Sequence, residues 1–387
     1  MTTTLTSNAR APLENAMPSL SRRQWLLGAS ASLLPATLLA QPSRSLELVQ
    51  IVDNSAGQID VSRDFLIGAR AAWQEFNSKG GLRGRSVQHT VLEVDGSPAS
   101  LKQALDTIRD LPNCVGLFGT AGARTANRVS QLLAQGNVPL AHIAPWLHTP
   151  SADAPDRTFN IFAPYKAQIE YALKSLATVG VADIGAVYAD PQEQVFYQPQ
   201  ITRIATDLKL RLQNYTPQGG NLRQLGQQMT AQAPIILLFI GSTLELAQFA
   251  QGLDGQDRMR YVIGLSDVNM QTLHQLGRYR QAAVVTTQVV PMTTASLPLV
   301  RNYRTTLARL FDEPPAPLSL SGYVAARYAQ DVLTTLDSNA TRAQVLQAFQ
   351  KRAAFDMGGY YVSVQGQRDS VAYVTQSMLT ADGRILG

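Results

Sequence analysis

Residues 119–125 are the part of this sequence whose residue types most clearly suggest binding of a ligand. They read Gly-Thr-Ala-Gly-Ala-Arg-Thr and stand between an expected strand and an expected helix. The positive end of a helix, with its free N–H groups and nearby hydroxyls, is a favourable binding site for a carboxylate. We therefore predict ligand contacts at the following positions: Thr120, Ala121, Gly122, Ala123 and Arg124. The alternatives are an ordinary strand-to-helix turn and a surface role for Arg124.

No arrangement of residues predicts catalysis or cofactor binding. Residues 119–125 lack the spacing of a dinucleotide fingerprint and of a phosphate-binding loop. The sequence has no G-x-S-x-G elbow and no clustered His, Cys and Asp. His142 and His148 resemble a metal-binding pair only superficially, because no carboxylate or cysteine cluster accompanies them. We expect no enzyme activity, no metal and no cofactor, with an exported enzyme kept as an alternative.

Residues 1–40 have the pattern of an export signal. Arg22 and Arg23 precede Trp25 and an apolar run that ends at Ala40. This run is shorter than the roughly 20 residues that span a bilayer comfortably. The pattern resembles a twin-arginine signal, with Trp25 at the aromatic position and Leu27 in place of Lys. A Sec signal and an uncleaved anchor are the alternatives. We expect removal of residues 1–40 and a soluble protein outside the cytoplasm.

Length and composition indicate a globular protein of two domains. The chain has 387 residues, of which 45% are hydrophobic, and a single cysteine, Cys114. This length suggests two lobes once the leader is removed. The formal net charge is only +5, and no run of Lys and Arg suits nucleic acid. We therefore expect no nucleic-acid partner.

Short apolar runs alternate with longer amphipathic segments along residues 46–289. Residues 46–53, for example, read as a strand, and residues 63–79 as a helix with apolar side chains at core spacing. The same alternation continues through a strand at 114–118 to residue 143. It restarts at residue 169, with a strand at 183–188 and helices at 195–208 and 221–231. Strands that alternate with helices indicate α/β lobes with parallel, doubly wound sheets. Helices at 298–311, 321–336 and 342–350 follow, and the chain ends in strands at 359–364 and 371–380.

Several motifs resemble those of type I periplasmic binding proteins, the family that includes the leucine/isoleucine/valine-binding proteins of ABC importers. Residues 76–84, Phe-Asn-Ser-Lys-Gly-Gly-Leu-Arg-Gly, look like the family's N-G-(I/L)-x-G signature. Residues 115–120, 137–140 and 321–326 resemble further family motifs in the same order. The likeness covers about residues 46–387.

This resemblance implies two doubly wound, Rossmann-like lobes joined by three crossover segments, the periplasmic binding protein-like I fold. We expect lobe 1 at residues 41–162 and 291–355, and lobe 2 at residues 163–290 and 356–387. The crossings should fall near 162–165, 290–291 and 355–359. Ligands of such proteins bind between the lobes, which close by hinge motion.

The resemblance also indicates cleft residues after other strands. Ala144 and Trp146 follow the strand that ends near residue 143, and Trp146 stands where the family often has Thr or Ser. We predict that Trp146 forms a stacking wall for an apolar or aromatic ligand, with packing inside its own lobe as the alternative. Phe196 or Tyr197 should supply an aromatic cleft residue.

Polar residues complete the predicted site. Ser242 ends one strand of lobe 2, and Ser266 and Asp267 end another. In amino-acid binders of the family an acid at such a position holds the ligand ammonium group. Ser266 aligns with that position here and Asp267 is its neighbour, so an α-amino acid and a neutral or carboxylate-bearing molecule both remain candidates. For Asp267 a helix N-cap is an equal alternative.

The resemblance implies that this chain is a monomeric periplasmic protein that delivers a small ligand to an ABC permease in the inner membrane. The ligand would be an amino acid or a small carboxylate or amide, with an aromatic group as one option. The alternative from another class is a sensory ligand-binding protein without a transporter, because fold alone does not separate transport from sensing.

Overall fold

The structure is a computed structural model that describes residues 45–136, 139–148, 156–277, 279–366, 372–380 and 385–387. The predicted export signal at residues 1–40 lies outside the described residues. Within those described ranges, no helix is long and apolar enough to cross a membrane.

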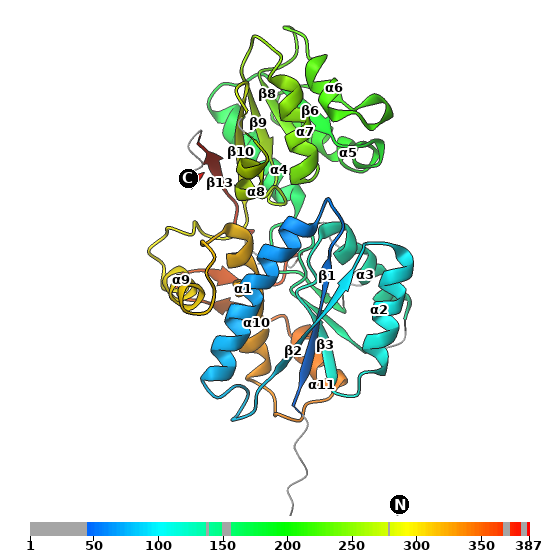
Figure 1. The fold of residues 1–387 in the computed structure, drawn as a ribbon, viewed down its shortest axis with the longest axis vertical. Helices are drawn as coiled ribbons and strands as arrows, with labels where there is room; N and C mark the ends of the chain where they lie inside the picture. The colour runs from blue at the N-terminus through cyan, green and yellow to red at the C-terminus, as the bar shows by residue number, and fades with distance from the viewer. Residues whose placement is uncertain (1–44, 137–138, 149–155, 278, 367–371, 381–384) are drawn as a thin grey trace, which may run out of the picture. The chain divides into compact units, whose positions relative to one another are not determined.

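Lobe 1 is built on a five-stranded parallel sheet with the strand order β2-β1-β3-β4-β5 (Figure 1). Its strands are β1 (Glu47–Asp53), β2 (Gln88–Val94), β3 (Cys114–Phe118), β4 (Ala141–Ile143) and β5 (Thr158–Phe159). Every residue of β1 is buried. Leu48 and Val49 belong to apolar clusters on opposite faces of the sheet. A run of apolar residues therefore forms a central parallel strand here because both faces are covered.

Helices cover both faces of this sheet. They are α1 (Ile59–Ser78), α2 (Pro98–Asp110), α3 (Ala123–Gln135), α9 (Pro298–Leu310), α10 (Pro317–Leu333) and α11 (Arg342–Gln350). Apolar side chains of α2 and α3 form the cluster on one face. Those of α1, α9, α10 and α11 contribute to the cluster on the other, as Figure 1 shows for α1 and α10. The C-terminal helices thus complete the core of lobe 1.

Helices α1 and α10 cross at two glycines. A Cβ atom on Gly68 would lie 1.6 Å from the carbonyl oxygen of Ser319, and one on Gly322 would lie 1.9 Å from that of Phe65. Only glycine allows such close backbone contact. Gly322, in the motif at 321–326, therefore has a packing role, and this crossing fixes α1, which begins directly after Gln58.

Lobe 2 is built on a seven-stranded sheet with the order β14-β13-β10-β9-β8-β6-β7. Its strands are β6 (Asp183–Tyr188), β7 (Arg211–Tyr215), β8 (Ile236–Ile240), β9 (Arg260–Gly264), β10 (Ala282–Gln288), β13 (Thr375–Leu379) and β14 (Ile385–Leu386). The strands from β6 to β10 are mutually parallel, whereas β13 runs antiparallel to β10. A doubly wound sheet thus gains an antiparallel edge from the end of the chain.

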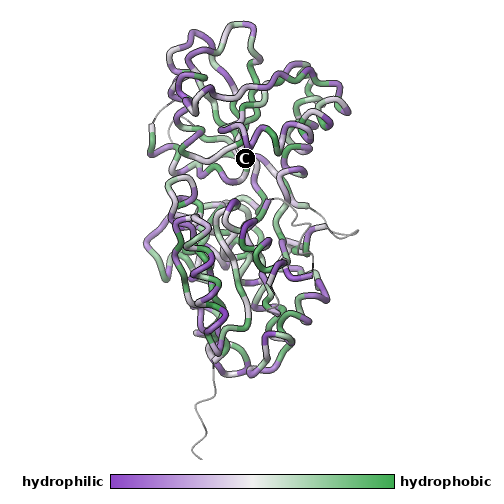
Figure 2. Tube along the Cα trace, turned by 90° about the vertical axis from the view of Figure 1, so that its right-hand side faces the viewer, coloured by the Kyte–Doolittle hydropathy of each residue, from purple (hydrophilic) through white to green (hydrophobic). Residues whose placement is uncertain are grey.

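Helices again lie on both faces of the lobe 2 sheet. They are α4 (Tyr165–Thr178), α5 (Pro191–Asp207), α6 (Leu222–Gln227), α7 (Thr243–Leu253) and α8 (Met270–Leu276), with a 3₁₀ turn η1 (Gln218–Gly220). Helices α4 and α5 pack on one face, and α6, α7 and α8 on the other. Figure 2 shows hydrophobic stretches inside both lobes and hydrophilic residues along the outer helices.

The predicted α/β class with two lobes is confirmed, and the main differences concern the starts of helices. Helix α5 begins at Pro191 rather than near residue 195, and Asp190 caps it by accepting hydrogen bonds from the backbone N–H groups of Gln192 and Glu193. Helix α10 begins at Pro317 rather than at residue 321. Proline is favoured in the first turn of a helix, so both prolines mark the earlier start.

Other expected elements are shorter than predicted. The helix expected at 221–231 covers only Leu222–Gln227, and the strand expected at 359–364 is reduced to β12 (Tyr361–Val362), which pairs with β11 (Phe355–Asp356). This small hairpin belongs to lobe 1, because Met357, Tyr360 and Val362 pack in its apolar cluster. These contacts attach the hairpin, where the third crossing was expected, to the core of lobe 1, and the position of that crossing stays a prediction.

The strand orders identify where a ligand site should lie. In lobe 1 the order changes direction between β1 and β3, and in lobe 2 it does so between β6 and β8. The loops beyond the carboxyl ends of such strand pairs enclose a crevice that commonly binds ligands. These loops begin after Asp53 and Phe118 in lobe 1 and after Tyr188 and Ile240 in lobe 2.

Candidate functional site

A cleft of about 320 Å³ lies beyond these strand ends and is lined by both lobes. Lobe 1 contributes side chains from the start of α1 and the exposed face of α3, and lobe 2 contributes α5 and the loops after β8 and β9. The lining residues are Gln58, Ala123, Arg124, Asn127, Arg128, Gln131, His148, Tyr165, Gln192, Glu193, Phe196, Tyr197, Ile240, Gly241, Ser242 and Asp267. The set combines amides, aromatic rings and charged groups.

The first turn of α3, the predicted carboxylate-binding site, already holds acceptors from the protein itself. The backbone N–H of Ala123 donates to Oε1 of Gln58 at 3.1 Å. The hydroxyl of Thr125 donates to Oδ2 of Asp53 at 2.6 Å, and Asp53 is 2% exposed. Gly122, with φ at 99°, lets the chain turn beside the Asp53 side chain. An internal carboxylate thus stands where a ligand carboxylate was expected.

Thr120 and Ala121 lie beneath the cleft wall. Both are fully buried, and neither lines the cleft. The hydroxyl of Thr120 is 2.8 Å from Nε2 of His142, whose Nδ1 is 3.1 Å from the hydroxyl of Ser130. Burial lowers the pKa of His142 to about 3, so its ring is neutral at physiological pH. Thr120 and His142 therefore support the loop from below.

Arg124 crosses the mouth of the cleft. Its Nη2 lies 2.8 Å from Oε1 of Glu193 and 3.3 Å from Oδ2 of Asp190, both at the start of α5 in lobe 2. Burial alone would lower the pKa of this guanidinium, but its pairing with Glu193 outweighs that effect and raises the pKa. Arg124 therefore links the two lobes as a permanent cation.

Asp267 forms the base of the cleft with three donors. Its Oδ1 accepts hydrogen bonds from Trp146 Nε1 at 2.5 Å and from His148 Nε2 at 2.9 Å, and its Oδ2 accepts one from the Tyr165 hydroxyl at 2.5 Å. The ring of His148 stacks on that of Tyr165 with centroids 4.6 Å apart. Because Trp146 and His148 follow β4 of lobe 1 while Asp267 follows β9 of lobe 2, this network also joins the lobes.

The electrostatics of the base keep Asp267 ionised. Burial would raise the pKa of Asp267, but the contact with His148 and the hydrogen bonds from Tyr165 and Trp146 outweigh it and hold the pKa below its usual value. Burial, together with the nearby Asp267 charge, raises the pKa of Tyr165 well above its usual value. The tyrosine therefore remains a donor to a charged acceptor.

Trp146 is not the stacking wall that the sequence suggested. It is 1% exposed, does not line the cleft, and packs against Phe65 and Phe162 of its own lobe with ring centroids 5.8 and 5.0 Å away. Its indole N–H needs a partner when the ring is buried, and Asp267 provides it. Ala144, which is fully buried with φ at 45°, likewise lies behind the wall.

The aromatic lining comes from Phe196 and Tyr197 together. Both lie on α5 and line the cleft, although Phe196 is 59% exposed and Tyr197 only 8%. The ring of Tyr197 lies 5.5 Å from that of Tyr165, centroid to centroid. The open choice between Phe196 and Tyr197 thus resolves into a buried ring beside an exposed one.

The two predicted serines have different places. Ser242 lines the cleft and caps α7, where its side chain and that of Glu245 form a reciprocal capping box. Ser266 lies outside the cleft in a separate, water-sized space near Asp64 and Asn269. Its backbone N–H donates to Oε1 of Gln168 at 3.0 Å. Ser242 is therefore better placed than Ser266 for ligand contact.

Sequence reasoning missed most of the polar lining, namely Gln58, Asn127, Arg128, Gln131, Gln192 and Glu193. Three of these residues could have been predicted from helical spacing. Asn127 and Gln131 follow Ala123 at four-residue steps, and Arg128 follows Arg124 by four residues. Residues at this spacing share one face of a helix. Once Ala123 and Arg124 were placed on α3, the next two turns on that face were predictable.

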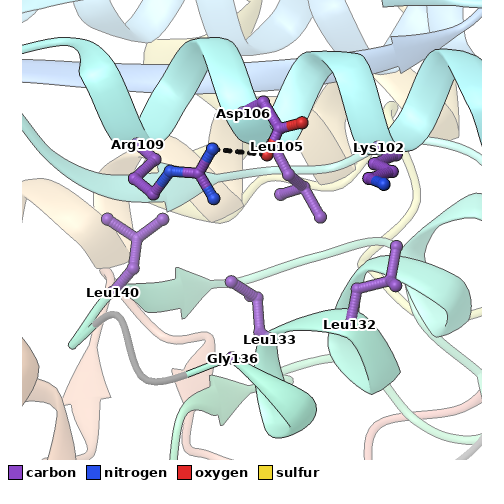
Figure 3. A pocket seen from close by; sticks show the side chains of 8 residues that line it. All are labelled: Lys102, Leu105, Asp106, Arg109, Leu132, Leu133, Gly136 and Leu140. Carbon is purple, nitrogen blue, oxygen red and sulfur yellow. Dashed lines mark hydrogen bonds and ion pairs between the residues drawn. The ribbon is translucent and has the colours of Figure 1, made fainter.

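Besides the cleft and the small space at Ser266, the described residues enclose other hollows, of which two are larger. One of about 610 Å³ adjoins the cleft and shares Gln58, Arg124, Arg128 and Ser242 with it. The other, of about 180 Å³, lies between α2 and the C-terminal end of α3 (Figure 3). Four leucines and the ion pair of Arg109 with Asp106 line it, and it contains none of the predicted ligand-binding residues.

The chain belongs to the periplasmic binding protein family. The model of that family matches residues 48–378, which is most of both lobes. No curated protein sequence matches this chain. The family assignment therefore depends on the match of the family model, which agrees with the resemblance noted in the sequence motifs.

Solved structures share the fold at low sequence identity. An extracellular ligand-binding receptor from Verminephrobacter eiseniae superimposes with a TM-score of 0.78 and 17% identity, covering 89% of this chain and all of the receptor. A possible leucine/isoleucine/valine-binding protein from Rhodopirellula baltica gives 0.75 and 18%, covering 90% and 98% of the two chains. A substrate-binding periplasmic protein from Ralstonia solanacearum gives 0.75 and 19%, covering 88% and 99%.

Proposed function

We propose that this chain is an exported solute-binding protein that captures a small ligand between its lobes by hinge closure and delivers it to an ABC importer. The observation that best supports this proposal is the cleft at the strand ends of both lobes, which is lined by amides, aromatic rings and charged groups. Membership of the periplasmic binding protein family supports this function. We infer no catalytic role for the lining residues.

The ligand is an amino acid or a small carboxylate or amide with room for an aromatic group. The cleft volume of about 320 Å³ lies in the range of small-molecule sites. Tyr165, Phe196 and Tyr197 offer rings, and Gln58 and Asn127 offer amides. The Rhodopirellula relative carries a name that refers to branched-chain amino acids, which motivates including leucine, isoleucine and valine among the test ligands.

Binding is tested by thermal denaturation of the purified protein with amino acids, aliphatic and aromatic acids, and their amides. A ligand at about 100 times its dissociation constant should raise the free energy of unfolding by roughly 2.7 kcal/mol. Asn127→Ala should reduce the shift because Asn127 lines the cleft, whereas Lys102→Ala on α2 should not. Absence of any shift over the whole panel would contradict ligand capture.

Transport and export need separate tests in cells. Deleting the gene should abolish high-affinity uptake of the bound ligand, and unchanged uptake would instead favour the sensory alternative. Replacing Arg22 and Arg23 with Lys should leave the protein in the cytoplasm if residues 1–40 act as a twin-arginine signal. Normal export of this variant would point to the Sec route.

A further inference from the structure

The carboxylates that line the cleft already have partners, and this restricts the ligand. Asp267 and Glu193 are the acidic residues among the described lining of the cleft. Three donors occupy Asp267, which has about four lone-pair positions, and the residue is only 5% exposed. Nε and Nη2 of Arg124 both donate to Oε1 of Glu193, at 3.2 and 2.8 Å. A ligand ammonium would therefore have to share each of these carboxylates with internal donors.

The anionic part of a ligand also cannot use the first turn of α3 in the expected way. Oε1 of Gln58 accepts the Ala123 N–H, and the buried carboxylate of Asp53 accepts the Thr125 hydroxyl. The negative charge of Asp53 already benefits from the positive helix end and repels a second carboxylate. The two groups that would recognise an α-amino acid are thus both satisfied by this chain's own residues.

Arg128 is the cation of the cleft that has no acidic partner. It lies one helical turn after Arg124 on α3 and lines both the cleft and the adjoining hollow. Its Nη1 donates to the carbonyl oxygen of Gly96 at 2.9 Å. Within the described ranges, no carboxylate oxygen lies within 4.0 Å of its guanidinium. The remaining N–H groups can bind a carboxylate in a bidentate manner.

We propose that the cleft selects a small aromatic carboxylate without an ammonium group, with Arg128 as the counter-ion of the carboxylate. The ring would contact Tyr165, Phe196 and Tyr197, which line the same cleft. An ammonium group loses its hydration on entry, and the carboxylates that line the described cleft, Glu193 and Asp267, already pair with internal donors. This inference rests on the proposed ligand-binding function and names the ligand class of the same site.

The proposal is tested by calorimetric titration of the purified exported protein with three compounds that share the same ring and the same side-chain length. They are 3-phenylpropanoate, L-phenylalanine, which adds the ammonium group, and 3-phenylpropanamide, which lacks the negative charge. We expect 3-phenylpropanoate to bind at least tenfold more tightly than either of the others.

Each contrary result identifies the step that is wrong. Binding of phenylalanine as tightly as 3-phenylpropanoate would overturn the exclusion of the ammonium group while leaving the ligand-binding function intact. Equal binding of the amide would overturn the counter-ion role. If none of the three binds, the proposal fails, and the ligand panel of the preceding section then decides whether the broader function fails as well.

Arg128→Gln tests the counter-ion directly. This variant should bind 3-phenylpropanoate at least tenfold more weakly and should lose the preference for the acid over the amide. Lys102→Gln, which removes a positive charge from α2 outside the cleft, is the matched control and should leave both affinities unchanged. Equal melting temperatures without ligand exclude a folding defect, and unchanged affinity of Arg128→Gln would refute the assignment.

Discussion

The base and the mouth of the cleft both join the lobes through acidic residues, but in opposite environments. At the base, the Asp267 side chain is 6% exposed and accepts hydrogen bonds from Trp146, His148 and Tyr165. At the mouth, the Arg124 side chain is 56% exposed and pairs with the side chains of Glu193 and Asp190, which are 18% and 34% exposed. Buried charges depend strongly on their partners, whereas exposed pairs are screened by water and salt. The base should therefore stabilise the lobe arrangement far more than the mouth.

The largest effect is expected for Asp267→Ala. This change leaves the indole N–H of Trp146, the ring N–H of His148 and the hydroxyl of Tyr165 without their buried acceptor. We expect the free energy of unfolding to fall by about 3–5 kcal/mol, measured by urea denaturation. A loss below about 1 kcal/mol would remove the distinction between base and mouth.

Tyr165→Phe removes a single donor from the base and keeps the ring. The hydrogen bond goes to a charged acceptor, so we expect a loss of about 1.5–3 kcal/mol in the free energy of unfolding. Tyr171→Phe on the same helix is the control, because Tyr171 is 39% exposed and should tolerate the change. Equal stability of the two variants would contradict a structural role for the Tyr165 hydroxyl.

A third contact between the lobes extends the comparison of base and mouth, because a substitution there should stabilise the protein. Nδ2 of Asn269, at the start of α8, donates to Oδ2 of Asp64 on α1 at 2.9 Å. Burial raises the pKa of Asp64 to about 6, with Asp60 adding to the shift and Asn269 and Arg63 opposing it. The folded state therefore binds this proton more tightly than the unfolded chain, and stability falls as pH rises from about 4 to about 6.

Asp64→Asn should abolish this loss because an amide does not ionise. We expect the variant to be more stable than the original protein by about 1–2 kcal/mol at pH 7 and similar to it at pH 4. Denaturation curves at several pH values provide the measurement, and Asp312→Asn, at an exposed position, is the control. A difference between Asp64→Asn and the original protein that does not change with pH would contradict the assignment.

The smallest effect is expected at the mouth. Arg124→Gln should reduce the free energy of unfolding by less than about 1 kcal/mol, because ion pairs with a solvent-exposed guanidinium contribute little. The effect should shrink further in high salt. A double-mutant cycle with Glu193→Gln isolates the pair, and a coupling energy as large as the loss at Tyr165 would show that the mouth is as important as the base.

Much of the fold followed from local patterns. The strands at 114–118 and 183–188 were predicted with the bounds that the structure shows, because each is a short apolar run beside turn residues. The same patterns placed the loop after β3 and the segment after β6 at strand ends. Four of the residues predicted there, Ala123, Arg124, Phe196 and Tyr197, line the cleft, and their contact with a ligand stays a prediction. The attachment of the β11–β12 hairpin to lobe 1 depends on packing contacts, and the start of α5 depends on capping contacts, neither of which periodicity reports.

The sequence by itself determined two α/β lobes and which loops face the cleft, because strand and helix periods are local properties of the chain. Only the tertiary structure decided which side chains are free for a ligand. Asp267 meets a Trp146 donor 121 positions away, and Arg124 meets Glu193 69 positions away. Such pairings depend on how the elements pack in space. For that reason Trp146 packs behind the base of the cleft, and Arg128, rather than Arg124, is the arginine of the described cleft lining that has no acidic partner among the described residues.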